Sequence, residues 1–335
     1  VQMINSSNAD IINLHWIHNE MLSIKDISRI KKPLVWTLHD MWAFCGAEHL
    51  SKDNRWLKGY YRNNRPITEF GFDVNRWTWN RKLKYWKKTF QIITPSKWLS
   101  DCVKKSKLMN NWPVETIPNP IDVKKWRPLN KHNSRKYFNL PQGANLIVFG
   151  AMEANIDKNK GFSILLSALK HISKRKKKTT NFEFVIFGVK KKIIKNKINI
   201  PIHQVGYLDN DEKLQMIYSA ADLIVVPSKQ ESFCQVASEA HSCATPVVAF
   251  NIGGLKDIID HKKTGFLAKA YDSKDLAKGI NWVLKNKQFI NFRYNARNKV
   301  LKNFDEKLIA RQYVKIYKKI MAKTRNKKIS NKDFI

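Results

Sequence analysis

The sequence predicts an α/β protein with two domains, each built on a parallel sheet. The clearest sign is a βαβ unit near the middle of the second half. It opens with the β-branched run Leu223–Val226 and continues through a polar loop into a helical pattern that Pro246 ends. A second apolar run, Val247–Phe250, follows. Such units form parallel sheets covered on both faces, and 335 residues suffice for two cores.

The first half shows the same alternation of strands and helices. Apolar runs predict strands at 10–14, 34–38, 91–94 and 114–117, with helices at 22–31, 75–88 and 96–107 between them. A doubly wound sheet normally opens with a first strand and a Gly-rich turn. Neither is present before residue 10, so we expect the first domain to lack its N-terminal strand and helix.

The segment from Trp42 to Phe72 is aromatic and irregular, which is typical of a functional loop or lid. The helix after it places an aromatic stripe among lysines and arginines: Trp79, Leu83, Trp86 and Phe90. Two alternatives fit this stripe. It rests on a membrane interface or a sugar acceptor, or it packs in the core while the basic residues are solvated.

Pro118 and Pro120 stiffen the exit from the first half, and the polar stretch 122–134 indicates a linker. We therefore place the first domain at 1–128 and the second at 129–335. The second domain begins with a strand from Asn145. Its last helix, about 308–322, is expected to cross back onto the first domain, and residues 325–335 to form a frayed basic tail.

The loop and helix after Val226 carry residues suited to an anionic ligand. Glu231 precedes the helix and Glu239 follows two turns later. At the helix start, the N–H groups of Phe233, Cys234 and Gln235 and the helix dipole favour a pyrophosphate. A sugar would then reach Glu231 and a ribose Glu239. The alternative is two solvated acids on an ordinary helix.

The string PSKQESFCQVASEAHSCATPVVAFNIGG resembles the donor-site signature of retaining, nucleotide-sugar-dependent glycosyltransferases of the GT-B fold, family four. That pattern runs P-S-x-x-E-x-F-G, with a second Glu eight positions later, then A-x-G-x-P-V-V-A and a Gly-Gly turn. This chain has Cys234 and Ala244 where the family has Gly. The resemblance implies two Rossmann-like domains with an interdomain cleft, the donor being bound mainly by the second.

The resemblance also assigns roles to residues. In PLVWTLHD, His39 matches the family's catalytic-centre His, and His15 and His18 could line the same cleft. Lys160 stands where the family has the Lys that contacts the donor diphosphate, although the partner Arg of many relatives is absent. His39 and Glu231 are therefore the catalytic candidates. The donor-binding candidates are Lys160, Tyr207, Leu208, Phe233, Cys234, Gln235, Glu239, Gly253 and Gly254.

The implied reaction moves a hexose from a nucleoside-diphosphate sugar to a glycan or lipid-linked acceptor with retention. Lipopolysaccharide or exopolysaccharide assembly is the family's commonest setting. The nucleotide sugar is a co-substrate, and no cofactor is expected. The donor half has no D-x-D pair beside a strand, so we expect no required metal. His39, Cys45 and His49 could be read as metal ligands, although no motif fixes their spacing. An inactive or partner-dependent GT-B domain, or a GT-B epimerase, are alternatives.

The charge balance of 62 Lys and Arg against 27 Asp and Glu favours anionic partners. A basic nucleic-acid-binding protein is a further alternative. The lysines are spread along the chain, however, without zinc-finger or RNP-type patterns, so no nucleic-acid partner is expected. Four cysteines without a C-x-x-C pair, and no apolar run of membrane-span length, predict a cytoplasmic protein. Peripheral contact with the anionic inner face of the plasma membrane is left open.

Overall fold

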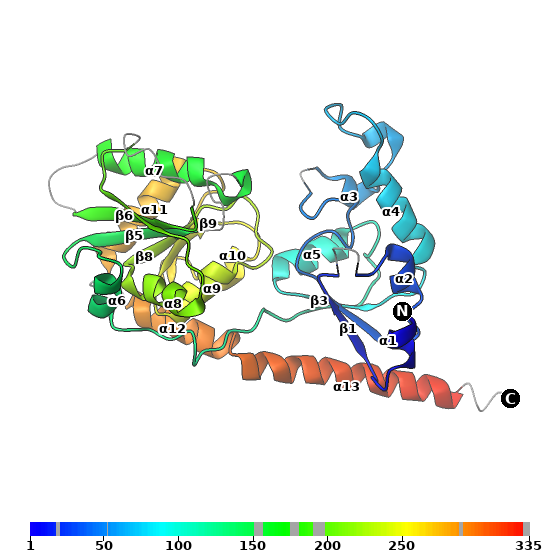
Figure 1. Cartoon of the computed structure of the whole chain (residues 1–335). Coiled ribbons are helices and arrows are strands. Elements are labelled where there is room, and N and C mark those ends of the chain that lie inside the picture. Colours follow the sequence, from blue (N-terminus) through cyan, green and yellow to red (C-terminus); the bar gives the residue numbers. More distant parts are fainter. Residues whose placement is uncertain are drawn as a thin grey trace. The chain divides into compact units, whose positions relative to one another are not determined.

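The computed structural model describes residues 1–17, 21–51, 53–150, 157–174, 181–189, 198–287 and 291–330. The chain divides into two units, Val1–Pro118 with Ile309–Ile335, and Asn119–Leu308. Each unit has its own parallel sheet (Figure 1). No helix among the described residues combines the length and the apolar character needed to cross a bilayer.

The first unit is built on a sheet in the order β1–β2–β3–β4. Its strands are Ile12–His15, Leu34–Thr37, Gln91–Thr94 and Val114–Thr116. The helices are α1 (Gln2–Ser6), α2 (Ile24–Ser28), α3 (Arg55–Lys58), η1 (Arg62–Asn64), α4 (Val74–Tyr85) and α5 (Lys97–Lys105). Side chains alternate along each strand, so Leu34 and Trp36 enter the core with α2 and α4, while Val35 faces the other side.

That other side is covered by the long terminal helix α13 (Glu306–Ser330). Its Ile309 and Ile316 pack against Val35 and Ile93, and the Tyr317 hydroxyl accepts a hydrogen bond from Asn13 at 2.7 Å. The helix continues to Ser330, whereas the sequence predicted a frayed tail from residue 325. Residues 331–335 lie outside the described residues.

The chain leaves the first unit at Pro118, not at residue 128 as predicted. The reason is that the supposed linker is held by the second unit. The Ile121 N–H donates to the Phe304 carbonyl oxygen at 2.7 Å, and Ile121 and Trp126 are buried in that unit's core. The linker was predicted from its polar composition, which does not show that these two apolar side chains pack into the second unit.

The second unit has six parallel strands in the order β10–β9–β8–β5–β6–β7. They span Asn145–Gly150 (β5), Phe182–Phe187 (β6), Ile202–Gly206 (β7), Leu223–Val226 (β8), Val247–Phe250 (β9) and Gly265–Ala268 (β10). The chain adds strands first on one side of β5 and then on the other, so the order reverses between β5 and β8. Ligands of such sheets bind at this switch point, beyond the carboxyl ends of the strands.

Helices cover both faces of this sheet (Figure 1). Their bounds are α6 Lys131–Tyr137, η2 Lys158–Lys160, α7 Phe162–Lys174, α8 Asp211–Ala220, α9 Gln235–Ser242, α10 Leu255–Ile258, α11 Ser273–Asn286 and α12 Phe292–Asn303. One apolar core joins α7 and α11 to the sheet, and another joins α8, α9 and α12. The predicted βαβ unit is confirmed as β8, α9 and β9.

The aromatic stripe of α4 belongs to the core, so its interpretation as a membrane or acceptor surface is wrong. Trp79, Trp86 and Phe90 are buried, and only Leu83 is exposed. Lys82, predicted as a solvated residue, is fully buried: its ammonium donates to the carbonyl oxygens of residues 42, 45 and 46. This lysine fixes the start of the long loop that follows β2.

Candidate functional site

Three loops meet at the switch point of the second sheet. They follow β5, β8 and β9, and hydrogen bonds tie them together. The Lys229 N–H donates to the Asn159 carbonyl oxygen at 2.7 Å, and the Asn159 amide donates to the Gln230 carbonyl oxygen at 3.1 Å. The Gly254 N–H donates to the Glu231 carbonyl oxygen at 2.9 Å. The loop that carries Glu231 is therefore held from both sides.

Glycines allow these loops to approach closely. A Cβ on Gly161, where φ is +68°, would lie 1.8 Å from the Pro227 carbonyl oxygen. One on Gly253, where φ is +47°, would lie 2.1 Å from the Glu231 carbonyl oxygen. Neither a side chain nor the usual L-residue backbone conformation fits at these positions. The predicted Gly253–Gly254 turn thus shapes the site through its backbone.

Lys160 and Glu231 come together at this point. The Lys160 Nζ lies 3.3 Å from Glu231 Oε1, and both side chains are partly exposed. Burial alone would lower the pKa of Lys160, but the Glu231 carboxylate outweighs it and the net shift of the pKa is upward. A cation and a carboxylate thus lie together beside Gly161 and Gly253, an arrangement that suits a ligand with a phosphate at one end and hydroxyl groups at the other.

The start of α9 differs in detail from the prediction. The helix begins at Gln235, with Cys234 as its N-cap at φ 97° and ψ 90° and no side-chain capping bond. The exposed residue at this end is Gln235, whereas the Phe233 ring is buried against Phe304 at a centroid distance of 5.5 Å. The first N–H groups of a helix have no intrahelical partner, so the backbone at Gln235 can receive an anion. Phe233 contributes packing through its side chain.

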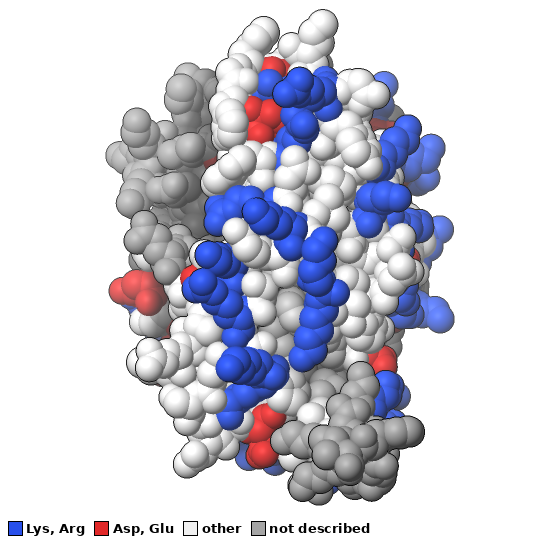
Figure 2. Space-filling model, turned by 90° about the vertical axis from the view of Figure 1, so that its right-hand side faces the viewer, with Lys and Arg blue, Asp and Glu red and all other residues white. Residues whose placement is uncertain are grey.

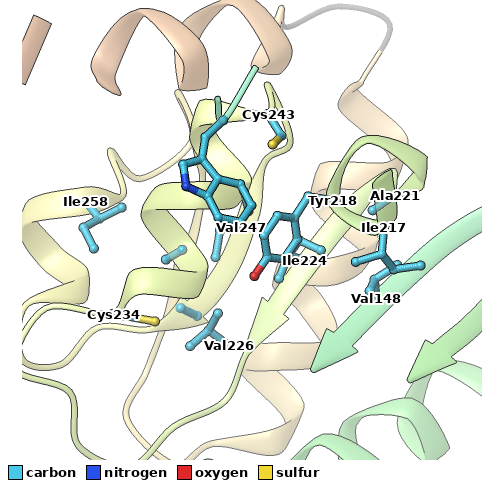
Figure 3. Close-up of a cluster of buried hydrophobic side chains, with 14 of the residues drawn as sticks. Val148, Ile217, Tyr218, Ala221, Ile224, Val226, Cys234, Cys243, Val247 and Ile258 are labelled. Atoms are coloured by element: carbon cyan, nitrogen blue, oxygen red, sulfur yellow. The ribbon is translucent and has the colours of Figure 1, made fainter. Parts of the chain in front are cut away.

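Glu239 lies on α9 and accepts a hydrogen bond from the Tyr218 hydroxyl at 3.1 Å. Tyr218 itself lies within the apolar cluster shared by α8, β8 and α9 (Figure 3). Burial raises the pKa of Glu239 to about 7. Near neutral pH, the protonated and ionised forms of the Glu239 carboxyl group are therefore both populated.

Tyr207 and Leu208 follow β7, the edge strand, which lies two strands from β5. Tyr207 is exposed and Leu208 packs against the core beneath α8. The helix α8 starts just after them, capped by Asn210, and ends near Tyr218 and hence Glu239. These residues share the carboxyl edge of the sheet with the Lys160–Glu231 pair without joining its hydrogen-bonded loops.

His39 belongs to the first unit, just beyond β2. Its Nε2 lies 3.1 Å from Nδ1 of His15, at the end of β1. Burial, and then the neighbouring His15, lower the pKa of His39. His49 Nδ1 lies 2.6 Å from the Asp40 carboxylate. The structure thus places His15 beside His39, and His18 lies outside the described residues.

Cys45 is buried in the apolar core of the first unit. Within the described ranges, no group of three His, Cys, Asp or Glu side chains is placed to hold a metal ion.

Two residues of the site were missed from the sequence. Asn159, which joins the β5 and β8 loops, was given no role there. Tyr218, the hydrogen-bond partner of Glu239, sits in an apolar helical pattern that predicts core packing. The only available signal was a polar atom on a buried tyrosine, which usually requires a partner.

Comparison with known proteins identifies related sequences across most of the chain. The family model "Glycosyl transferases group 1" matches residues 130–302, and the model "Glycosyltransferase Family 4" matches residues 1–125. A D-inositol 3-phosphate glycosyltransferase of Catenulispora acidiphila is 29% identical over 185 residues, which are 51% of this chain and 42% of that protein. The chain matches between 16% and 42% of the length of its curated relatives.

Solved structures share the fold. A glycosyltransferase from Rickettsia africae superposes with a TM-score of 0.69 at 19% identity, covering 96% of this chain and 79% of that one. HepE from Anabaena, solved in complex with UDP-glucose, gives a TM-score of 0.65 at 19% identity, covering 95% and 79%. These similarities confirm the predicted fold class of two parallel-sheet α/β domains, as in GT-B enzymes.

Proposed function

Because the chain belongs to the group 1 glycosyl transferases, we propose that it transfers a hexose from a nucleoside-diphosphate sugar to a glycan or lipid-linked acceptor with retention at the anomeric carbon. The observation that carries the proposal is the Lys160–Glu231 pair, 3.3 Å apart, beside two glycines, Gly161 and Gly253, at which no side chain fits. The UDP-glucose in the HepE complex supports a nucleotide-sugar donor.

In this proposal the donor diphosphate displaces Glu231 from Lys160. The ammonium and the N–H groups at the start of α9 then face the negative charge that develops on the leaving diphosphate. Glu231, released from its ion pair, accepts hydrogen bonds from sugar hydroxyls and lies near the positive charge of the sugar ring. The pair is thus exchanged for two ligand contacts, and each side chain keeps a hydrogen-bonding partner.

Glu239 takes the ribose in this proposal. An ionised carboxylate can accept hydrogen bonds from both hydroxyls of a diol, and the Tyr218 hydroxyl fixes its orientation from below. Tyr207 and Leu208 flank the nucleobase, and His39 orients sugar or acceptor. We expect no cofactor besides the co-substrate and no required metal, and a setting in lipopolysaccharide or exopolysaccharide assembly on the cytoplasmic face of a membrane.

The test is release of nucleoside diphosphate from a panel of donors, such as UDP-glucose, UDP-N-acetylglucosamine and GDP-mannose, with and without lipid-linked acceptors. Wild-type protein should turn over one of them, and Glu231→Gln should reduce kcat at least 100-fold, as removal of a group acting on the transition state does. Glu306→Gln, at an exposed glutamate of α13, is the matched control and should retain activity.

Normal turnover by Glu231→Gln would contradict the assignment of this carboxylate. Donor binding without turnover of any acceptor would instead favour an inactive or partner-dependent GT-B domain, and the unusual backbone at Cys234 is the feature that would then need explaining.

A further inference from the structure

The loop between η1 and α4 exposes large apolar side chains to solvent, whereas most loops expose polar ones. Its apolar residues face solvent: Ile67 is 92% exposed, Phe70 88% and Phe72 70%. Single exposed apolar residues are common on protein surfaces, but a contiguous group of large ones indicates a docking site. These three lie within six residues of one another on a single projecting loop.

The charged residues of the same loop, Arg65, Glu69 and Asp73, are partly buried in ion pairs. Arg55 of α3, only 3% exposed, donates from Nη2 to Glu69 at 2.8 Å and from Nε to Asp53, which precedes α3, at 2.9 Å. Arg65 donates to the carbonyl oxygen of residue 71 at 2.9 Å and lies 3.7 Å from the Asp73 carboxylate. The ion pairs therefore neutralise the loop's acids and hold its backbone. The apolar side chains are presented by a fixed framework.

Basic and aromatic residues continue this surface along α4. Trp77 is 49% exposed, contacts the Phe72 ring and carries the Arg81 guanidinium 4.7 Å above its own ring. The helix contains no Asp or Glu, and exposed lysines follow at 84, 87 and 88. In the view of Figure 2, Lys and Arg side chains are spread over much of the visible face, with few Asp and Glu among them.

We propose that this aromatic–basic surface, made by Ile67, Phe70, Phe72, Trp77, Arg81, Lys84, Lys87 and Lys88, docks on an anionic phospholipid bilayer. The apolar tip enters the interfacial region, and Trp77 with its stacked arginine lies at headgroup level. The lysines contact lipid phosphates, which are attracted to clustered positive charge near the surface. The partner is the lipid surface itself, and the docking does not depend on the proposed donor site.

The charge pattern and the apolar tip favour this partner over a nucleic acid. Binding to a duplex nucleic-acid backbone needs positive charge but gains nothing from an exposed isoleucine and phenylalanine at a loop tip. A bilayer uses both parts, because electrostatic attraction and apolar insertion add at its interface. The surface also differs from the stripe of Trp79 and Trp86, which is buried.

The experiment is flotation of the full chain with vesicles of 70% phosphatidylcholine and 30% phosphatidylglycerol, a composition chosen to give the anionic surface potential. The triple variant Ile67→Ser/Phe70→Ser/Phe72→Ser should lower the partition coefficient at least tenfold. Its thermal unfolding should match wild type because all three side chains are exposed. The control Tyr137→Ser/Tyr294→Ser/Val314→Ser removes three exposed apolar side chains elsewhere and should leave partitioning within twofold.

A second variant tests the charge. Lys84→Ala/Lys87→Ala/Lys88→Ala should weaken binding at low salt and flatten its salt dependence, whereas the exposed control set Lys136→Ala/Lys302→Ala/Lys307→Ala should do neither. Unchanged flotation of the serine variant, or equal binding to pure phosphatidylcholine, would overturn the proposal. The proposal would also be overturned if neither wild type nor the serine variant bound vesicles, while the serine substitutions abolished oligonucleotide binding or self-association. Donor binding by the serine variant should equal wild type, so failure of this surface and failure of the donor site remain distinguishable.

Discussion

Cys234 occupies a backbone conformation, φ 97° and ψ 90°, that residues with a side chain rarely adopt. Its sulfur is buried in the core of the second unit, and burial raises the pKa of the thiol, so the side chain is a neutral packing group. Cys234 and Ala244 both stand where the resembled family has Gly, and both have positive φ. The positive φ angles at these two positions therefore explain why the family prefers Gly there.

The strain at Cys234 predicts an unusual order of stability. Cys234→Gly should be more stable than Cys234→Ala by about 1–2 kcal/mol, because both lose the sulfur but only glycine relieves the strained φ. Urea unfolding of the two variants measures the difference. Alanine otherwise gives the more stable protein, because it lowers the conformational entropy of the unfolded chain, so an alanine variant as stable as the glycine one would show that the backbone is unstrained.

Glu239 predicts a pH-dependent stability. Its pKa is raised from 4.5 to about 7 in the folded state. Between these values the folded protein binds more protons than the unfolded chain, so the contribution of Glu239 to stability falls as the pH rises, by up to about 3 kcal/mol. Glu239→Gln removes this loss. Its unfolding midpoint relative to wild type should increase from pH 5 to pH 8.

The matched control is Glu212→Gln, at an exposed glutamate on α8. Its difference from wild type should be the same at both pH values. A constant difference for Glu239→Gln as well would show that this carboxyl titrates normally and that Tyr218 does not hold it in a buried setting.

At the scale of elements, the site is made by loops that only glycine can bring together. Gly161 lies against the Pro227 carbonyl, with φ at +68° and no room for a Cβ. Gly143, in contrast, has nothing within 4 Å of its Cβ position. Replacing each of these glycines by alanine therefore separates the cost of the close backbone approach at Gly161 from the cost of replacing any loop glycine.

Gly161→Ala should destabilise the protein by roughly 2–5 kcal/mol, the sum of left-handed backbone strain and overpacking. Gly143→Ala should be nearly neutral. Chemical denaturation of both variants tests this, and similar small effects would mean that the η2 loop moves away from β8 at little cost.

The elements of the site could be predicted from local pattern, but the contacts between them could not. The runs Leu223–Val226 and Val247–Phe250 gave both strands with their bounds, because β-branched runs bounded by turn residues have few other interpretations. The Tyr218–Glu239 and Asn159–Gln230 hydrogen bonds join residues far apart in the chain. Nothing in a single sequence indicates such pairs. The burial of Lys82 and Arg55 could not be predicted either, because basic residues are rarely buried without specific partners.

At the scale of the whole molecule, the end of the chain returns to the first unit. Ile309 is 1% exposed in the core that α13 forms with β2 and β3. Ile309→Ala should therefore cost about 2–5 kcal/mol. Val314→Ala, on the same helix but 47% exposed, should change stability by less than about 0.5 kcal/mol. Equal effects in thermal unfolding would mean that α13 contributes no packing to this sheet.

The sequence predicted the two-sheet architecture correctly, but it placed the boundary between the two domains too late in the chain. Alternating strands and helices require parallel sheets, and both sheets are present. The boundary moved to Pro118 because Ile121 and Trp126 anchor the connecting segment, a fact that only tertiary packing reveals.

We propose that Lys160 and Glu231 form a binding site for a nucleoside diphosphate attached to a sugar. Calorimetric titration of UDP and UDP-glucose, and of their GDP and ADP counterparts, into wild type, Lys160→Ala and Lys170→Ala tests this proposal. Lys170 is an exposed lysine on α7 and serves as the control. We predict binding of one nucleotide series, at least tenfold weaker in Lys160→Ala, a loss of about 1.4 kcal/mol, and unchanged in Lys170→Ala. Equal affinity in all three proteins, or no binding of any nucleotide, would contradict the account.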